Sequence, residues 1–218
     1  MFLLVMGVTG LALAGLGGVA MAETPNVAPL KLAVLGDSLT AGYGLPASAA
    51  FPVRLQRALK EKGITVDIVN AGVSGDTASG GRDRLDWSIP QGTQAVIVEL
   101  GANDMLRGVD PKVTRAALDE IVQRLKARDI DVLLCGMYAA PNLGEHYARA
   151  FNSIYPDLAK KYNVALYPFF LDGVVDNAAL KQADGLHPTA AGVDVIVQRI
   201  LPTVEAFVKK VPPARAVL

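Results

Sequence analysis

The sequence feature that most constrains the fold is an alternation of short apolar runs with longer amphipathic segments, which begins at Lys31. Such alternation is typical of βαβ units, in which a helix crosses from one parallel strand to the next. Several runs are rich in Val, Ile and Leu without polar alternation, as expected for strands covered by helices on both faces. The predicted strands are residues 31–35, 65–70, 95–100, 131–137 and 164–167.

The segments between these runs carry helix signals. Residues 51–62, 111–128 and 189–208 have apolar side chains at helical spacing. Gly63 follows the first segment as a C-terminal stop, and Asp110 with Pro111 forms a favourable start for the second. The Gly- and Ser-rich stretch 74–82 is expected to be a flexible connection.

These signals together predict an α/β fold. Because crossovers between parallel strands are right-handed, the elements build a three-layer α/β/α sandwich around a five-stranded parallel sheet, as in flavodoxin-like folds. The sequence has no internal repeat, low-complexity tract or long linker. Residues 23–218 are therefore predicted to form a single domain.

The N-terminal segment indicates export. Residues 1–22 contain no charged side chain, and residues 2–19 are apolar and small. Ala20 and Ala22 provide the small residues that a signal peptidase requires. We expect a signal peptide that is cleaved near Ala22, and a periplasmic or secreted protein without stable membrane insertion. An uncleaved anchor helix is the alternative, because no Lys or Arg precedes the apolar stretch; its five glycines make a poor permanent helix.

The composition excludes several classes of protein. Lys and Arg total 21, as do Asp and Glu, so the formal net charge of zero gives no reason to expect a nucleic-acid partner. The single cysteine, Cys135, cannot form an intramolecular disulfide, and two histidines, His146 and His187, are too few for a multi-histidine metal site. No phosphate loop or dinucleotide fingerprint is present, so neither metal nor cofactor is expected. Without heptads, a monomer is expected.

Polar residues follow the first three predicted strands. Ser38 lies at a strand-to-helix turn, where a backbone amide near a helix N-terminus stabilises negative charge. Gly72 follows the second strand and can bring a bare backbone amide close to a ligand, and Asn103 follows the third strand with a side-chain donor. Taken singly, Ser38 is more often an ordinary N-cap, and the other two are common loop residues.

A carboxylate and an imidazole lie near the C-terminus, in Asp184-Gly185-Leu186-His187. A histidine side chain, with an ordinary pKa of about 6.5, suits a base that takes a proton from serine. Asp184 could accept the Nδ1 proton and orient the ring. Taken singly, His187 could also be a surface histidine before a proline, and Asp184 an aspartate that forms a turn.

The four segments considered together resemble the GDSL, or SGNH, serine hydrolases. The name lists Ser, Gly, Asn and His, which match Ser38 in GDSL, Gly72 in AGVSGDT, Asn103 in GAND and His187 in DGLHP. The resemblance covers roughly residues 32–200 and is to the exported thioesterase/lysophospholipase/arylesterase branch of Gram-negative bacteria. The Gly-x-Ser-x-Gly nucleophile elbow of the α/β-hydrolases is absent.

The resemblance implies a role for each of these residues. Ser38 would be the nucleophile, His187 the general base and then acid, and Asp184 its orienting partner. The oxyanion hole would consist of the Ser38 and Gly72 amides and the Asn103 side chain. Asp37 and Asp104 are expected to fix the surrounding loops by hydrogen bonds.

The resemblance also implies a serine esterase or thioesterase that acts on small acyl esters or thioesters through an acyl-serine intermediate. Leu106, Tyr138 and Leu186 are expected to line the acyl pocket. A carbohydrate O-acetylesterase on the same scaffold is an alternative. A non-catalytic flavodoxin-like binding protein is another, although it leaves the joint occurrence of the motifs unexplained.

Overall fold

The computed structural model describes residues 28–212 and the first two residues of the chain. All but Met1 and Phe2 of the predicted signal peptide, and its cleavage site, lie outside the described residues. Among the described residues, no helix is both long and apolar enough to cross a membrane.

The predicted five-stranded parallel sheet is confirmed. Its strand order is β2-β1-β3-β4-β5, and every neighbouring pair is parallel. The order reverses between β1 and β3, which is the position where ligands bind in open α/β sheets. The strands are β1 (Leu30–Gly36), β2 (Val66–Gly72), β3 (Ala95–Glu99), β4 (Asp131–Cys135) and β5 (Ala165–Tyr167).

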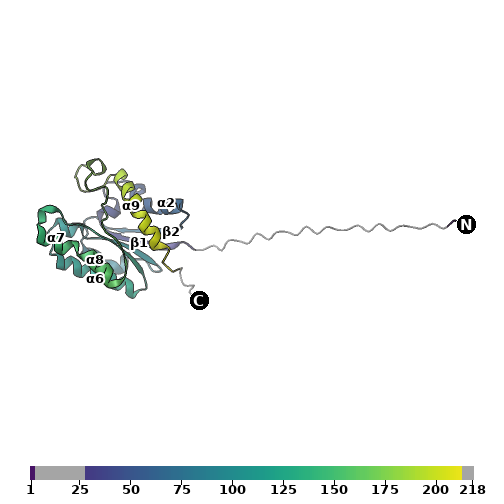
Figure 1. The fold of residues 1–218 in the computed structure, drawn as a ribbon, viewed down its shortest axis with the longest axis horizontal. Coiled ribbons are helices and arrows are strands. Elements are labelled where there is room, and N and C mark those ends of the chain that lie inside the picture. The colour runs from purple at the N-terminus through teal and green to yellow at the C-terminus, as the bar shows by residue number, and fades with distance from the viewer. Residues whose placement is uncertain (3–27, 213–218) are drawn as a thin grey trace.

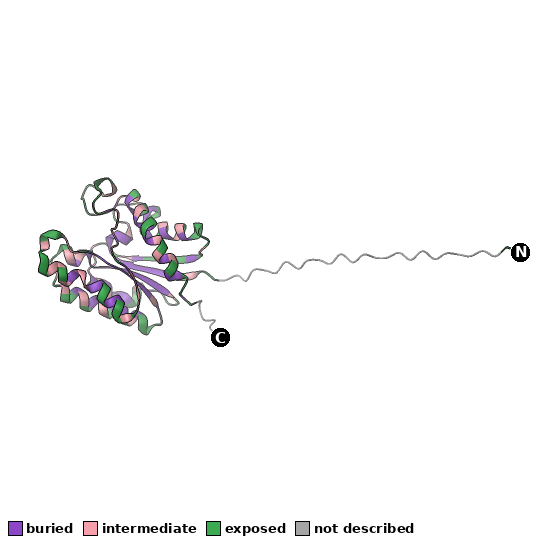
Figure 2. Cartoon of the chain, viewed as in Figure 1, coloured by how far each residue is buried: buried purple, intermediate pink, exposed green. Residues whose placement is uncertain are grey.

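Helices cover both faces of the sheet, which confirms the three-layer architecture (Figure 1). On one face α2 (Phe51–Glu61) packs against α9 (Ala190–Val208), and on the other α6 (Pro111–Ala127) packs against α8 (Ile154–Tyr162). Buried residues concentrate in the strands and in the inward sides of the helices (Figure 2). The shorter helices are α1 (Ser38–Ala41), α3 (Ala78–Asp83), α4 (Leu85–Ser88), α5 (Ala102–Leu106) and α7 (Glu145–Asn152).

Two helix boundaries follow the signals in the sequence. The Asp110 carboxylate accepts a hydrogen bond of 2.9 Å from the Lys112 amide, so it caps α6 as predicted. Gly63, with a φ of +75°, adopts the left-handed conformation just beyond the end of α2.

The expectation of a flexible connection at residues 74–82 is wrong for its second half. Helix α3 begins at Ala78, because Thr77 Oγ1 caps it by accepting from the Gly80 amide at 3.2 Å. Gly81 packs so closely against Leu100 that a side chain there would collide with it. The glycines here allow a helix to pack tightly against the core rather than making the segment mobile.

The sheet register brings the carboxyl ends of three strands level. Gly36 of β1 pairs with Gly72 of β2 on one side and with Glu99 of β3 on the other. The segments that follow these strands therefore start at a common edge. This register places the loops of Ser38, Gly75 and Asn103 near one another.

Candidate active site

The turn that presents Ser38 depends on two neighbours. The Asp37 carboxylate caps α1 by accepting from the Leu39 amide at 2.9 Å, which fixes the first turn of the helix. Gly36 lies against Thr40 Oγ1 and the Glu99 backbone, where an added Cβ would collide with both. Ser38 is only 8% exposed, so the nucleophile candidate lies in a nearly buried turn.

Ser38, His187 and Asp184 form a continuous chain of contacts. Ser38 Oγ lies 2.9 Å from His187 Nε2, although 149 residues separate them in sequence. His187 Nδ1 lies 2.6 Å from Asp184 Oδ2, while Asp184 Oδ1 accepts hydrogen bonds from the Leu186 and His187 amides. The structure thus brings together the three residues that the sequence singled out.

The hydrogen bonds to Asp184 keep its carboxylate ionised. The contact with His187, followed by the Leu186 and His187 amides, lowers the Asp184 pKa to about 2. These bonds act on the charged form, since a carboxylate is stabilised by each donor that it accepts from. Asp184 is therefore a fixed negative charge beside the imidazole at any pH near neutrality.

Gly72 does not fit the role expected of it. Its amide already donates to Asn70 Oδ1 at 3.0 Å, and a side chain at this position would collide with Thr40 and Ala41 of α1. Gly75, three residues later, has a φ of +85°, and in the described part of the chain its amide donates to no acceptor. Sequence reasoning missed Gly75, although its place in the loop beyond the strand, next to Asp76, was a usable signal.

Asn103 follows β3, as the sequence predicted, and lies between the Ser38 turn and the loop of Gly75. Its Nδ2 atom donates to Asp76 O at 2.9 Å and to Asp37 Oδ2 at 3.1 Å. The side-chain amide therefore faces both segments that carry the candidate oxyanion donors. One of its two hydrogens is thus held by the Asp37 carboxylate.

Two carboxyl groups are buried beneath the nucleophile turn. Burial raises the pKa of Asp37 to about 6, against the opposing effect of its hydrogen bond from Leu39 and of His187. Burial, and then the charge of Asp37, raises the pKa of Glu99 well above its ordinary value. Glu99 Oε1 has no hydrogen-bond partner in the described part of the chain, so ionising this side chain is costly.

Hydrogen bonds from buried side chains hold the loops around the site. Arg84, missed in the sequence, donates to the Gly36 carbonyl and to the Asp76 carboxylate, so it ties the nucleophile turn to the loop of Gly75. The Asp104 carboxylate accepts from the Ala78 amide and from Thr114 Oγ1. Together with the Asp37 contacts, this confirms the expectation that Asp37 and Asp104 fix the loops.

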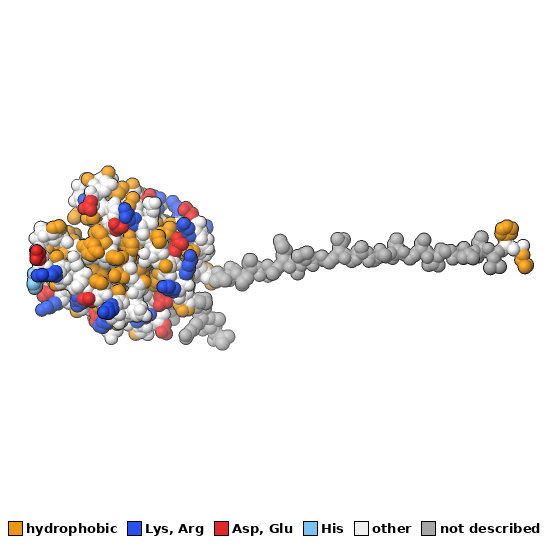
Figure 3. All heavy atoms as spheres, in the orientation of Figure 1, with side chains coloured by type: hydrophobic (Ala, Val, Ile, Leu, Met, Phe, Trp, Pro, Cys, Tyr) orange, Lys and Arg blue, Asp and Glu red, His pale blue; other side chains and the backbone are white. Residues whose placement is uncertain are grey.

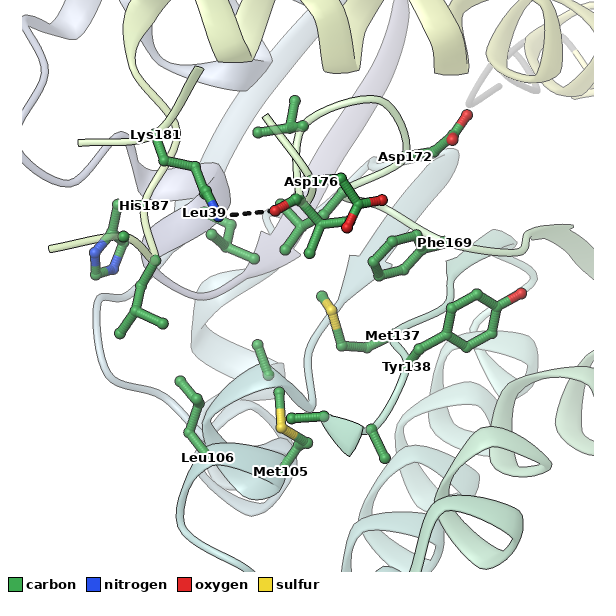
Figure 4. A pocket seen from close by; sticks show the side chains of 18 of the residues that line it. Leu39, Met105, Leu106, Met137, Tyr138, Phe169, Asp172, Asp176, Lys181 and His187 are labelled. Atoms are coloured by element: carbon green, nitrogen blue, oxygen red, sulfur yellow. Dashed lines mark hydrogen bonds between the residues drawn. The ribbon is translucent and has the colours of Figure 1, made fainter. Parts of the chain in front are cut away.

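An apolar cavity of about 670 Å³ opens beside Ser38 and His187. Figure 4 shows Met105 and Leu106 on one side and Met137, Tyr138 and Phe169 farther from His187. Leu106, Tyr138 and Leu186 all lie in its wall and are about half exposed, as a ligand-accessible surface requires. Within residues 28–212, no three His, Cys, Asp or Glu side chains gather into a possible metal site.

Comparison with known proteins agrees with this geometry. Residues 34–195 match the GDSL-like Lipase/Acylhydrolase family. Esterase TesA of Pseudomonas aeruginosa is 38% identical over 84% of this chain and 91% of its own length. Thioesterase 1/protease 1/lysophospholipase L1 of Escherichia coli is 43% identical over 72% of this chain and 74% of its own. The crystal structure of AlinE4, an SGNH-hydrolase family esterase, superposes with a TM-score of 0.70 at 45% identity, over 85% of this chain and 98% of that one.

The chain belongs to the GDSL-like lipase/acylhydrolase family, the SGNH hydrolases. It is a hydrolase that acts on ester bonds, of the esterase and thioesterase kind. The resemblance found in the sequence motifs is thereby confirmed for the family, the fold and the general reaction.

The buried Glu99 gives a test of the electrostatics beneath the turn of Ser38. Because its pKa is raised in the folded state, the wild-type protein loses stability as the pH rises from the ordinary glutamate value through the folded-state pKa. Glu99→Gln removes this loss, so the stability of the variant relative to wild type should grow as the pH rises. Urea unfolding at several pH values between 5 and 9 measures this difference.

Glu61→Gln is the matched control, because Glu61 is an exposed carboxylate at the end of α2. Its stability should follow that of the wild type at every pH. Parallel curves for Glu99→Gln and wild type would show that Glu99 ionises normally in the folded protein.

Proposed function

We propose that this protein hydrolyses acyl esters and thioesters through an acyl-enzyme intermediate on Ser38. The observation that carries the proposal is the chain of contacts from Ser38 through His187 to Asp184, at the mouth of an apolar cavity. A nucleophile, a base and an orienting carboxylate in this order constitute a serine hydrolase triad on any fold.

In the first half of the reaction, His187 Nε2 takes the Ser38 proton while Ser38 Oγ forms a bond to the carbonyl carbon of the substrate. His187 then gives this proton to the leaving oxygen or sulfur as the carbon–oxygen or carbon–sulfur bond breaks. Water repeats the sequence on the acyl-serine and releases a carboxylic acid. The fixed charge of Asp184 orients the ring and stabilises the imidazolium that forms twice in each cycle.

The negative oxygen that forms in each step requires donors. We assign these to the amides of Ser38 and Gly75 and to Asn103 Nδ2, with Gly75 in place of Gly72 because the Gly72 amide is already engaged. When the oxyanion forms, the Asn103 N–H that bonds to Asp37 in this structure donates its hydrogen bond to the substrate oxygen instead. The bond of Asn103 to Asp76 holds the side chain in place during this exchange.

The wall of the cavity favours an acyl chain over an acetyl group on a sugar. Its lining includes Leu39, Met105 and Met137, and Tyr138 stacks on Phe169 at a centroid distance of 4.7 Å. Burial of each added methylene contributes about 0.8 kcal/mol, close to a fourfold gain in kcat/KM when the transition state keeps the contact. The carbohydrate acetylesterase is therefore less well supported. The contacts from Ser38 through His187 to Asp184 oppose a non-catalytic binding protein.

We further propose that the protein is exported, with cleavage near Ala22, and works as a periplasmic or secreted monomer without metal or cofactor. The uncharged N-terminal segment supports export. Charges of both signs are interspersed on the face shown in Figure 3, which gives no reason to expect a nucleic-acid partner. Residues 23–218 are then the mature chain and a single domain.

Hydrolysis of a p-nitrophenyl ester series from acetate to palmitate tests the proposed reaction. We expect kcat/KM to rise from acetate through the medium chain lengths, by up to about fourfold per methylene. Ser38→Ala should abolish hydrolysis at every chain length, while circular dichroism shows an unchanged fold. The same comparison with acyl-CoA substrates measures thioester hydrolysis.

If Ser38→Ala retains near-normal rates of hydrolysis, Ser38 is not the nucleophile. A sharp optimum at acetate would favour the carbohydrate acetylesterase. Absence of any ester or thioester hydrolysis by the wild type would favour a binding role.

Asn103→Ala tests the oxyanion donors. Loss of one such donor should lower kcat by about 10²- to 10³-fold with little change in KM, because the bond is made to the transition state. Steady-state kinetics with the best ester of the series measures this. A raised KM at unchanged kcat would instead make Asn103 a contact for bound substrate.

Asn70→Ala is the companion variant, because it frees the Gly72 amide. If Gly75 is the donor, turnover should stay within a few-fold of the wild type. A gain in kcat would show that the freed Gly72 amide donates to the oxyanion.

A further inference from the structure

Few contacts hold the loop of His187 against the turn of Ser38. His187 lies in residues 181–188, an exposed hairpin-like loop that is closed by a bridge between Lys181 and Pro188 and contains Gly185 in the left-handed conformation. Apart from the Ser38–His187 contact itself, one hydrogen bond in the described part of the chain joins this loop to residues 37–45. It is donated by Gln182.

The Gln182 side chain spans the two segments. Its Nε2 atom donates to the Tyr43 carbonyl at 2.8 Å and to the Pro188 carbonyl at 3.0 Å. Because both acceptors are carbonyl oxygens, only the NH₂ end of the amide can serve them. Inside the His187 loop, its backbone amide donates to the His187 carbonyl at 2.7 Å and its carbonyl accepts from the Gly185 amide at 2.9 Å, so Gln182 is held firmly within this loop.

Tyr43, which accepts the hydrogen bond from the Gln182 side chain, lies directly beside Ser38 and His187. The Tyr43 amide donates to the Ser38 carbonyl, and the Tyr43 ring lies against the His187 imidazole at a centroid distance of 4.5 Å. Gly44, with a φ of +71°, lets the Gln182 amide approach the backbone so closely that a side chain at position 44 would collide with it.

We infer that Gln182 is a positioning residue, which sets the separation of His187 Nε2 from Ser38 Oγ by tying the His187 loop to the Ser38 turn. The inference rests on the proposed function, since it gives meaning to that separation. Proton transfer depends steeply on geometry, and a misplacement of about 1 Å can cost 10²-fold in rate. Gln182 is not among the residues that line the cavity, although Leu186 of the same loop is, so we expect the main effect on kcat and only a small one on KM.

Two isosteric variants test this role. Gln182→Glu keeps the shape and replaces both donors with acceptors that face two carbonyl oxygens, and Gln182→Met removes the donors without adding charge. We expect each to lower kcat by about tenfold or more on the best ester, with KM within twofold of the wild type. Agreement between the two variants shows that the loss comes from geometry and not from a new charge near the imidazole.

Gln94→Glu is the matched control. Gln94 Nε2 likewise donates to a distant backbone carbonyl, that of Pro212, but Gln94 directly precedes β3, at the sheet edge opposite the site. This variant should keep the wild-type kcat, and all three should have similar thermal unfolding midpoints. If Gln182→Glu does not fold, Gln182→Met decides the question.

A kcat within twofold of wild type in a folded Gln182 variant overturns the positioning role, and so does a rise in KM without a fall in kcat. An equal fall in kcat for Gln94→Glu also overturns it, because the effect would then be general. The proposed function fails separately, if Ser38→Ala retains the activity of the wild type.

Discussion

The contact between Ser38 Oγ and His187 Nε2 joins two segments that lie 149 residues apart, and the rest of the site depends on it. The sheet makes this contact possible, since the reversal of strand order beside β1 leaves the Ser38 turn open at the carboxyl edge. The loop of His187 reaches this edge just before α9, which packs against α2 on the same face of the sheet. The fold thus brings the segments near each other, and local hydrogen bonds set the final geometry.

The pKa values of two carboxyl groups of the site are shifted in opposite directions. Asp184 is partly exposed and accepts three hydrogen bonds, so it stays ionised beside the imidazole. Glu99 is fully buried, and its pKa is raised by burial and by the nearby Asp37. The nucleophile turn therefore has a fixed negative charge on the side of His187 and a carboxyl group that resists ionisation underneath.

Much of the fold and the triad could be predicted from the sequence, because each depends on local signals. Apolar runs mark strands, Asp110 caps a helix through its own side chain, and strand-end motifs converge once the sheet is parallel. Thr77 shows where local signals fail as predictors. Its hydroxyl caps a helix in a stretch whose glycines indicated a flexible connection.

The residues that the sequence missed act through contacts between distant segments. Gly72 and Gly75 flank one turn, and only the hydrogen bond from Gly72 to Asn70 shows that the first amide is already engaged. Gln182 and Arg84 carry no motif, and their importance appears only when the carbonyls of Tyr43 and Gly36 lie within reach. Tertiary packing decides such roles, so one sequence does not reveal them.

In the proposed reaction, His187 activates Ser38 as a nucleophile. Incubation of the mature protein with a p-nitrophenyl alkylphosphonate, followed by mass spectrometry of the intact chain and of its peptides, tests this directly. We expect one phosphonyl group per chain, attached to Ser38, and very slow labelling of His187→Ala under the same conditions. Labelling at another residue, or equally fast labelling of Ser38 without His187, would contradict it.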